Sequence, residues 1–183
     1  MKTTPQAIAD VLLIEPQVFG DQRGFFMESW NRRNYAAIGI DSDFVQDNHS
    51  RSQQGVLRGL HYQIRQPQGK LVRVISGAVF DVAVDLRRSS PTFGEWCGAL
   101  LSEQNQHQLW VPPGCAHGFL VLSAHADFLY KASDYYAPEH ERVLRWDDPD
   151  LAIDWPLADI GGPPQLAAKD AAGALWRDIE TYP

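Results

Sequence analysis

The fold is decided by Gly55-Val56-Leu57-Arg58-Gly59-Leu60-His61-Tyr62-Gln63 together with Pro112-Pro113-Gly114-Cys115-Ala116-His117-Gly118-Phe119. In both stretches one histidine lies among glycine and apolar residues. Glycine and proline mark turns, and the apolar residues between them suit short strands. The two stretches therefore indicate glycine-rich turns among short strands, with a histidine in each stretch.

The neighbouring segments also have the pattern of short strands. Residues 71–75 are rich in β-formers, and residues 78–86 alternate, with Asp81, Ala83 and Asp85 on one face and apolar side chains on the other. Further strands are predicted at 108–111, 119–122 and 127–131. Because turn residues recur throughout this region, the pattern favours a sandwich or barrel over βαβ units.

Helical patterns occur only at the flanks of this strand-rich region. One short helix is predicted at 28–38, and another at 170–179, with Asp170 in the position of an N-cap. The 183 residues are close to the usual size of one domain. We therefore expect a single domain over 1–183, all-β, with a few short flanking helices.

The composition argues against nucleic-acid and membrane partners and against a disulfide-rich fold. The net charge is −7, whereas nucleic-acid-binding surfaces are usually basic. No apolar run approaches the roughly 20 residues of a membrane helix, and the first residues lack the apolar stretch of a signal peptide. The two cysteines are too few for a disulfide framework. We expect a cytoplasmic protein with free thiols and no nucleic-acid or membrane partner.

The two histidine stretches resemble part of the cupin pattern, which implies a jelly-roll barrel (a double-stranded β-helix). Gly55 and His61 fit the first cupin motif, and Pro112, Gly114 and His117 fit the second. However, Gln63 stands where the first motif has another histidine, and the glutamate expected a few residues later is missing. Transition-metal sites usually need at least three protein ligands. We therefore expect no metal, which leaves an imidazole available as a general base.

A closer resemblance extends from about residue 10 to about residue 172. Its motifs are similar to those of the dTDP-4-dehydrorhamnose 3,5-epimerase family, and they include FGDQRGFFME at 19–28, QGKLVR at 68–73, FDVAVD at 80–85, SSPTFG at 89–94 and FLYK at 128–131. The resemblance implies a homodimeric cupin that inverts C3 and C5 of a dTDP-4-keto-6-deoxyhexose in the pathway to dTDP-L-rhamnose, without cofactor or metal. One departure is Cys115, where the family usually has phenylalanine, and we expect only a local change in packing.

The resemblance also implies the roles of individual residues. His61 is the expected base with Asp170 as its partner, Tyr130 is the acid on the opposite face of the sugar, and Lys70 lies near the 4-keto oxygen. Tyr136 is the expected stacking platform for thymine. The other residues that the resemblance places at the substrate are Arg23, Glu28, Gln46, Asn48, Arg58, His117, Glu141 and Lys169.

These roles agree with the chemistry of the reaction. Removal of a proton beside the C4 ketone gives an enolate, which a lysine can stabilise, and inversion requires reprotonation from the other face. Two points stay open at this stage. Asp81 is the rival partner of His61, and Asp170 could be only a helix N-cap.

Three other functions compete with the 3,5-epimerase. A metal-dependent cupin would use His61 and His117 as ligands, and a sugar-nucleotide-binding cupin would have no activity. The third is an epimerase that acts at C3 only or at C5 only on a related dTDP-4-keto sugar.

Overall fold

The computed structural model describes residues 1–8 and 10–183, most of which belong to antiparallel strands and their connections. The strands are β1 (Lys2–Pro5), β2 (Leu12–Glu15), β3 (Val18–Asp21), β4 (Gly24–Met27), β5 (Gln46–Gln53), β6 (Leu57–Gln63), β7 (Lys70–Ser76), β8 (Ala78–Asp85), β9 (Trp96–Ser102), β10 (Gln108–Val111), β11 (Cys115–Val121), β12 (His125–Ala132) and β13 (Glu141–Val143). The short helices are α1 (Arg32–Ala36), α2 (Ala168–Ala171) and the 3₁₀ turns η1 (Pro138–His140), η2 (Leu157–Ile160) and η3 (Trp176–Asp178).

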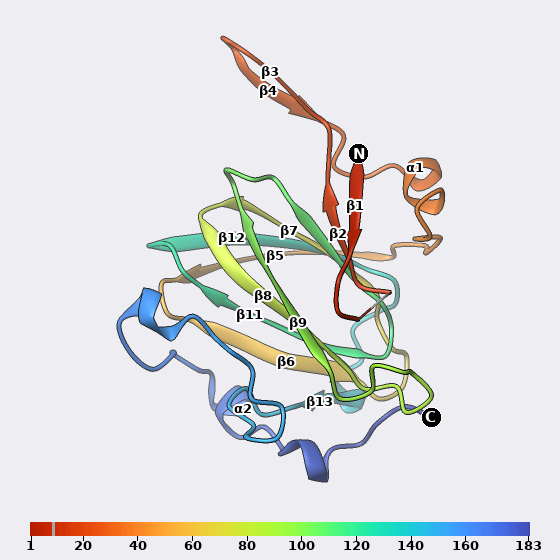
Figure 1. The fold of residues 1–183 in the computed structure, drawn as a ribbon, viewed down its shortest axis with the longest axis vertical. Coiled ribbons are helices and arrows are strands. Elements are labelled where there is room, and N and C mark those ends of the chain that lie inside the picture. The colour runs from red at the N-terminus through yellow and green to blue at the C-terminus, as the bar shows by residue number, and fades with distance from the viewer. Residues whose placement is uncertain (9) are drawn as a thin grey trace.

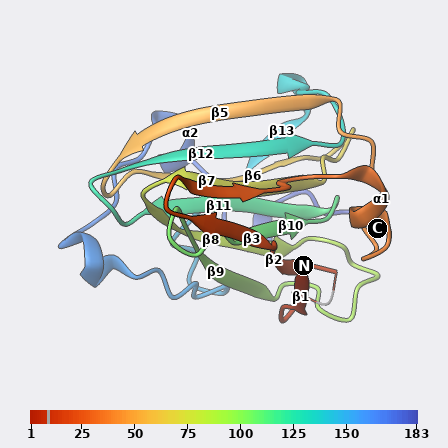
Figure 2. The ribbon, with the colours of Figure 1, turned by 90° about the horizontal axis from the view of Figure 1, so that it is seen from above.

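Two large sheets face one another (Figures 1 and 2). The six-stranded sheet has the order β1-β2-β10-β7-β12-β5, and the five-stranded sheet has the order β13-β6-β11-β8-β9. Strands that are neighbours in sequence often belong to different sheets, as β5 and β6 do. The chain therefore crosses repeatedly between the sheets, so both contribute to one enclosed space.

Three apolar clusters hold these layers together. The first lies between the two sheets and includes Val72, Phe119 and Phe128. The second packs the outer face of the five-stranded sheet against the C-terminal segment, and the third packs α1 against the six-stranded sheet. Apolar surface is buried on both faces of the five-stranded sheet, so its strands β8 and β11 are almost wholly buried.

The predicted strands are confirmed in position, except that the one predicted at 119–122 begins earlier, at Cys115, as part of β11. Residues 71–75, 78–86, 108–111 and 127–131 fall within or largely overlap β7, β8, β10 and β12. The alternation in β8 has the predicted consequence, because Val82 and Val84 pack in the cluster under the C-terminal segment, whereas Ala83 packs between the sheets. Both faces of β8 are buried, so its polar residue Asp81 is enclosed in the interior.

The predicted helices are only partly correct. The first begins at Arg32 rather than at residue 28, because the side chain of Asn31 accepts a hydrogen bond from the Asn34 N–H and so caps the helix there. The helix predicted at 170–179 is wrong. Helix α2 ends at Ala171, and Asp170 lies inside it rather than at its N-cap.

Close backbone packing explains this early end of α2. A Cβ at Gly173 would lie 2.9 Å from the Cα of Arg145, so the chain passes tightly against the segment that follows β13. The next residue, Ala174, then donates its N–H to Val143 and accepts one from Arg145. The backbone there is extended, which a helix would not allow.

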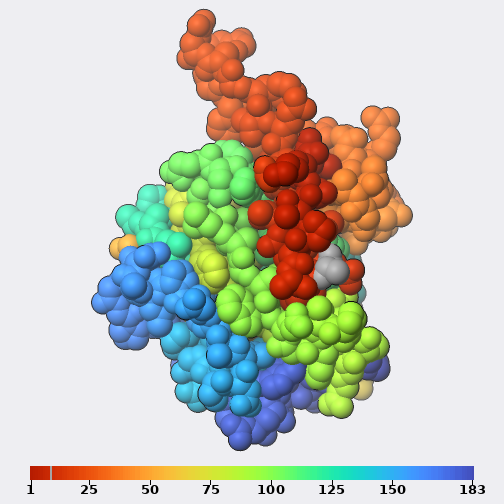
Figure 3. Space-filling view, in the orientation of Figure 1, coloured from red at the N-terminus to blue at the C-terminus, as the bar shows by residue number. Residues whose placement is uncertain are grey.

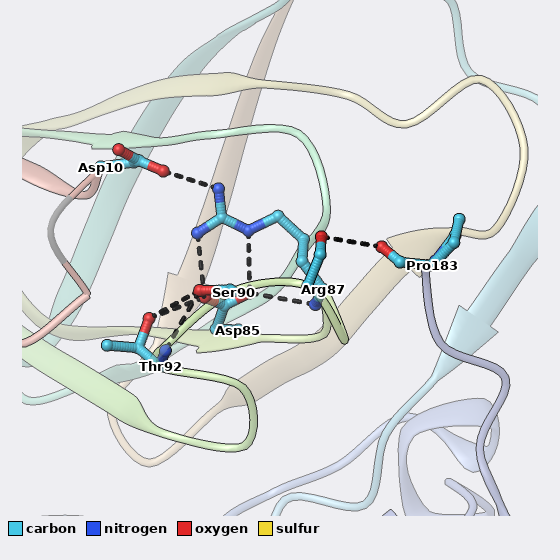
Figure 4. Close-up of polar contacts among 7 residues, drawn as sticks. Asp10, Asp85, Arg87, Ser90, Thr92 and Pro183 are labelled. Carbon is cyan, nitrogen blue, oxygen red and sulfur yellow. Dashed lines mark hydrogen bonds and ion pairs between the residues drawn. The ribbon is translucent and has the colours of Figure 1, made fainter.

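A buried carboxylate joins distant parts of the chain at one end of the fold (Figure 4). Asp85 accepts hydrogen bonds from Arg87, Ser90 and Thr92, and Arg87 also bonds to Asp10 at 2.7 Å. Although burial raises it, these hydrogen bonds lower the pKa of Asp85 to about 2. The turn after β8 is thereby fixed to the N-terminal segment.

The β3–β4 hairpin projects away from the body of the molecule (Figures 1 and 3). Its apolar side chains face outward, with Phe19, Phe25 and Phe26 at 56%, 60% and 70% exposure. The strand β2 that precedes it pairs with β1 and β10 of the same chain. No helix among the residues that the structure describes is long and apolar enough to cross a membrane.

Candidate active site

A cavity of about 330 Å³ opens between the two sheets. Strands from both sheets contribute to its walls, and the C-terminal helix α2 adds two charged residues. Its lining consists of Gln46, Asn48, Ser50, Arg58, His61, Gln68, Lys70, His117, Gly118, Phe119, Phe128, Tyr130, Tyr136, Glu141, Ala167, Lys169 and Asp170. The cavity thus gathers every site residue that the sequence predicts, apart from Arg23 and Glu28.

An extra residue in β6 brings two of these side chains to the same wall. His61 is opposite His117 and Arg58 is opposite Phe119, so two residues of β6 face the single residue Gly118. Without this bulge, Arg58 and His61 would point to opposite faces, because they are three positions apart. The bulge needs Gly59, whose φ is +119° and whose Cβ would lie 2.6 Å from the Cα of Gly118.

His61 forms a tight pair with a carboxylate. Its Nε2 lies 2.6 Å from the Oδ1 of Asp170, and the Asp170 side chain is only 3% exposed. Helix α2 is in contact with β6, and it supplies the carboxylate from its first turn. A buried carboxylate in this position fixes the tautomer and the orientation of the imidazole ring.

Asp81 proves to be the partner of a different histidine. Both of its carboxylate oxygens lie within 3.0 Å of the Nε2 of His117, and Asp81 is fully buried. Burial raises the pKa of Asp81, and the adjacent His117 and Lys70 act in the opposite direction. Of the two carboxylates that the sequence left open for His61, Asp170 is the one in contact.

Two further groups in the cavity have altered acidity. Burial lowers the pKa of Lys70 to about 8, although Glu141 and Asp81 oppose the change. Burial and the charge of Glu141 raise the pKa of Tyr130. Tyr130 therefore keeps its phenolic proton near neutral pH, while Lys70 titrates only slightly above it.

The mouth of the cavity contains a chain of polar contacts. The hydroxyl of Tyr136 donates to Glu141 at 3.3 Å, and Lys169 bonds both carboxylate oxygens of Glu141 at 3.0 Å. On the facing strand, Gln46 donates to the Oδ1 of Asn48. The Nδ2 of Asn48 is buried and has no hydrogen-bond partner among the described residues. A buried donor without a partner is costly, and a ligand in the cavity could satisfy it.

Arg23 and Glu28 lie outside the cavity. The side chain of Arg23 is 84% exposed on the β3–β4 hairpin, where it pairs with Asp21. Glu28 accepts hydrogen bonds from Asn31 and Asn34 beside α1. Within this chain alone, neither residue is brought together with His61.

Sequence patterns did not single out several residues of the site. Ser50, Gln68 and Phe128 line the cavity. Gln68 and Phe128 fall within motifs already quoted, and Ser50 lies two residues after Asn48 on the same face of β5, so these positions were the available signal. The two cysteines are free and buried, and Cys115 contributes to the apolar cluster between the sheets. Among the described residues, no three His, Cys, Asp or Glu side chains gather as metal ligands would.

Comparisons with known proteins point to one family. A sequence profile of the dTDP-4-dehydrorhamnose 3,5-epimerases matches residues 5–178. The enzyme of this name from Pseudomonas aeruginosa is 61% identical and is matched over the full length of both chains. The one from Salmonella typhimurium is 55% identical over 92% of each chain.

Solved structures agree with the sequence matches. The crystal structure of dTDP-6-deoxy-D-glucose-3,5-epimerase from Legionella pneumophila, in complex with dTDP-4-keto-L-rhamnose, is 55% identical with a TM-score of 0.93, over 98% of this chain and 94% of that one. A 3′-monoepimerase from Streptomyces bikiniensis in complex with dTDP-quinovose is 33% identical with a TM-score of 0.86, over 93% and 86% of the two chains. The mostly antiparallel β fold, the cavity and these matches together show that the chain belongs to the dTDP-4-dehydrorhamnose 3,5-epimerase family.

Proposed function

We propose that this protein converts dTDP-4-dehydro-6-deoxy-D-glucose to dTDP-4-dehydro-L-rhamnose by inverting C3 and C5, as a step in dTDP-L-rhamnose biosynthesis. The observation that carries the proposal is the His61–Asp170 pair, which opens into a cavity that also contains Lys70 and Tyr130. The relatives described above have this activity in their names.

In the proposed mechanism, His61 removes the proton. The hydrogens at C3 and C5 flank the C4 ketone, so the electron pair of the broken C–H bond moves to the C4 oxygen. Because Nε2 faces Asp170, the Nδ1 atom acts as the base. Asp170 then stabilises the imidazolium that forms.

Lys70 and Tyr130 complete each inversion. The Lys70 ammonium stabilises the negative charge on the C4 oxygen. Tyr130 donates its phenolic proton to the opposite face of the same carbon as the carbonyl re-forms. Each inversion removes one proton and adds another as the electron pair returns to the carbon, so there is no net redox change. Exchange with water restores the protonation of His61 and Tyr130 before the second carbon reacts.

The remaining cavity residues bind the nucleotide and the sugar. We assign Arg58 to the diphosphate, since a guanidinium suits its negative charge, and His117 to a polar contact with the substrate. Tyr136 stacks on the thymine ring. Gln46, Asn48, Glu141 and Lys169 supply the polar contacts around the rest of the substrate.

The protein acts as a homodimer in this proposal. The exposed phenylalanines of the β3–β4 hairpin favour a partner surface, because burying them would remove apolar area from water. If the hairpin enters the partner subunit's cavity, Arg23 and Glu28 reach a substrate there. A Phe26→Glu variant should then be monomeric with reduced activity, and a monomeric wild-type protein in light scattering would contradict the proposal.

We also propose a more specific fold for the chain. The two facing sheets support a cupin-type jelly-roll barrel that forms a single domain over 1–183. The reaction needs no cofactor and no metal, because the substrate's own ketone provides the electron sink. A cytoplasmic location would suit a nucleotide-sugar substrate.

The direct test is turnover of dTDP-4-dehydro-6-deoxy-D-glucose by the purified protein and its His61→Ala variant. General acid–base catalysis contributes at least about 10²-fold, so the variant should lose at least that factor. His49→Ala is the matched control, because His49 also pairs with an aspartate but lies outside the cavity. Near-normal turnover by His61→Ala would refute the assignment of the base.

Inversion at C3 only, or at C5 only, is the alternative function. The observation in its favour is the likeness to the 3′-monoepimerase, which has the same fold. Both reactions use a base and an acid on opposite faces of one carbon, so the groups in the cavity suit either.

A further inference from the structure

Gln63 occupies the position where the cupin pattern has its second histidine, but its side chain bonds to backbone groups instead. The residue is 4% exposed. Its Nε2 donates to the carbonyl oxygens of Gln66 at 2.7 Å and Tyr135 at 3.2 Å, and its Oε1 accepts the N–H of Ala137 at 2.9 Å. All the contacts of this amide are thus made with backbone groups, and two of them are on either side of Tyr136.

The segment 133–137 that receives these contacts has no strand or helix of its own. Side-chain amides hold it instead. Gln68 donates to the carbonyl oxygen of Asp134 at 2.8 Å, and Gln46 accepts the N–H of Tyr136 at 3.0 Å. Gln63 comes from β6 and Gln46 from β5, which belong to different sheets. The segment therefore bridges the two sheets at the mouth of the cavity.

Tyr136 lies between these anchors, and the residue is 51% exposed. A half-exposed aromatic ring on a segment without secondary structure would normally sample several orientations, and a ligand would have to order it. Fixing the backbone on both sides of the residue removes much of that cost before the ligand binds.

We propose that Gln63 is a positioning residue for recognition of the nucleotide base, because its hydrogen bonds to Tyr135 and Ala137 hold the Tyr136 ring in place to stack on thymine. This inference rests on the proposed function, in which Tyr136 contacts the base. A glutamine is needed because the site requires a donor and an acceptor on one short, uncharged group. Glutamate would lack the donor, and leucine would lack both.

The same strand then has two separate tasks. His61 and Gln63 are two residues apart on one face of β6, but His61 pairs with Asp170, whereas Gln63 contacts the segment 133–137. Proton transfer depends on His61, and binding of the thymine ring depends on Gln63. Loss of Gln63 should therefore weaken substrate binding while the chemical step continues.

The test combines Gln63→Leu, Gln63→Glu, Tyr136→Ala and the double variant Gln63→Leu/Tyr136→Ala. Calorimetry with thymidine diphosphate gives the dissociation constant, and steady-state kinetics give kcat and KM. Stacking of a base on an aromatic ring is worth roughly 5- to 150-fold in affinity, so a loosened ring should raise Kd and KM about tenfold in Gln63→Leu. We expect kcat to change by less than about threefold.

The double variant identifies the route of the effect. If Gln63 acts through Tyr136, then Gln63→Leu should add less than about twofold to Kd when Tyr136 is already alanine. A full tenfold addition in that background would overturn the inference, and so would an unchanged Kd in the single variant. The control is Gln54→Leu, because Gln54 also donates to a backbone carbonyl, that of Leu122, but does not line the cavity.

Amide hydrogen exchange provides a readout that does not depend on activity. Peptides that cover residues 133–137 should exchange faster in Gln63→Leu and in Gln63→Glu, while those from β8 stay unchanged. Unchanged exchange in 133–137 would overturn the inference even if the enzyme is fully active. Should Gln63→Leu fail to fold, Gln63→Glu retains the acceptor for Ala137 and tests the donor alone. A wild-type protein that binds thymidine diphosphate without epimerising the sugar would instead overturn the proposed function.

Discussion

Replacing Asp170 by asparagine should slow the reaction while the fold stays intact. The change keeps the size of the side chain but removes the negative charge that lies 2.6 Å from His61 Nε2. Because Asp170 is only 2% exposed, solvent screens this charge weakly. The charge contributes most when His61 carries the abstracted proton, so the loss should appear in kcat rather than in KM.

The expected size follows from the type of contact. A hydrogen bond to a charged group contributes about 1.5–3 kcal/mol, and each 1.36 kcal/mol corresponds to about a tenfold change in rate. Asp170→Asn should therefore lower kcat by roughly 10- to 150-fold, with KM within about threefold of the wild type. Initial rates on dTDP-4-dehydro-6-deoxy-D-glucose, followed by NMR, measure both constants.

Asp127→Asn is the matched control. Asp127 also contacts a histidine, His49 at 3.0 Å, but this pair lies on the outer face of the six-stranded sheet and outside the cavity. This control should keep its kcat, and thermal unfolding should show that Asp170→Asn is folded. A folded Asp170→Asn with wild-type kcat would refute the role of the carboxylate.

Three further predictions concern other residues. Because Lys70 has a pKa of about 8 and acts as a cation, kcat/KM should fall as the pH rises through about 8, and Lys70→Arg should move that fall to higher pH. Tyr130→Phe should still incorporate deuterium from the solvent beside the ketone, because His61 remains, but NMR should show little inverted product. Asp85→Asn should destabilise the fold by about 2 kcal/mol at pH 7, from a pKa lowered from 3.8 to about 2. In urea unfolding, the difference in free energy of unfolding between the wild type and Asp85→Asn should narrow as the pH falls from about 4 toward 2, where the wild-type carboxylate becomes protonated. A gap that persists at pH 2 would show that charge is not its cause.

Local patterns were sufficient for most of the strands. The alternation in residues 78–86 predicts β8 and the shared face of Asp81, Ala83 and Asp85, but it does not predict that this face is also buried. The pattern cannot say which histidine Asp81 meets. That pairing depends on the neighbouring strand, in which His117 lies beside β8.

Contacts between distant segments account for the features that local sequence patterns did not predict. The pattern at 170–179 suits a helix, but the close approach of Gly173 to Arg145 ends α2 early, and no local signal reveals that approach. The bulge at Gly59 likewise depends on Gly118, which lies on another strand. Arg23 was predicted at the substrate by resemblance, yet the hairpin points away from this chain's own cavity.

The central claim is that one cavity inverts both carbons beside the ketone. Incubation of the purified protein with dTDP-4-dehydro-6-deoxy-D-glucose in deuterated water, followed by position-resolved NMR, tests it most directly. We predict deuterium at both C3 and C5, together with the dTDP-4-dehydro-L-rhamnose configuration, and we predict that His61→Ala abolishes both signals. Deuterium and inversion at only one carbon, or at neither, would contradict the account.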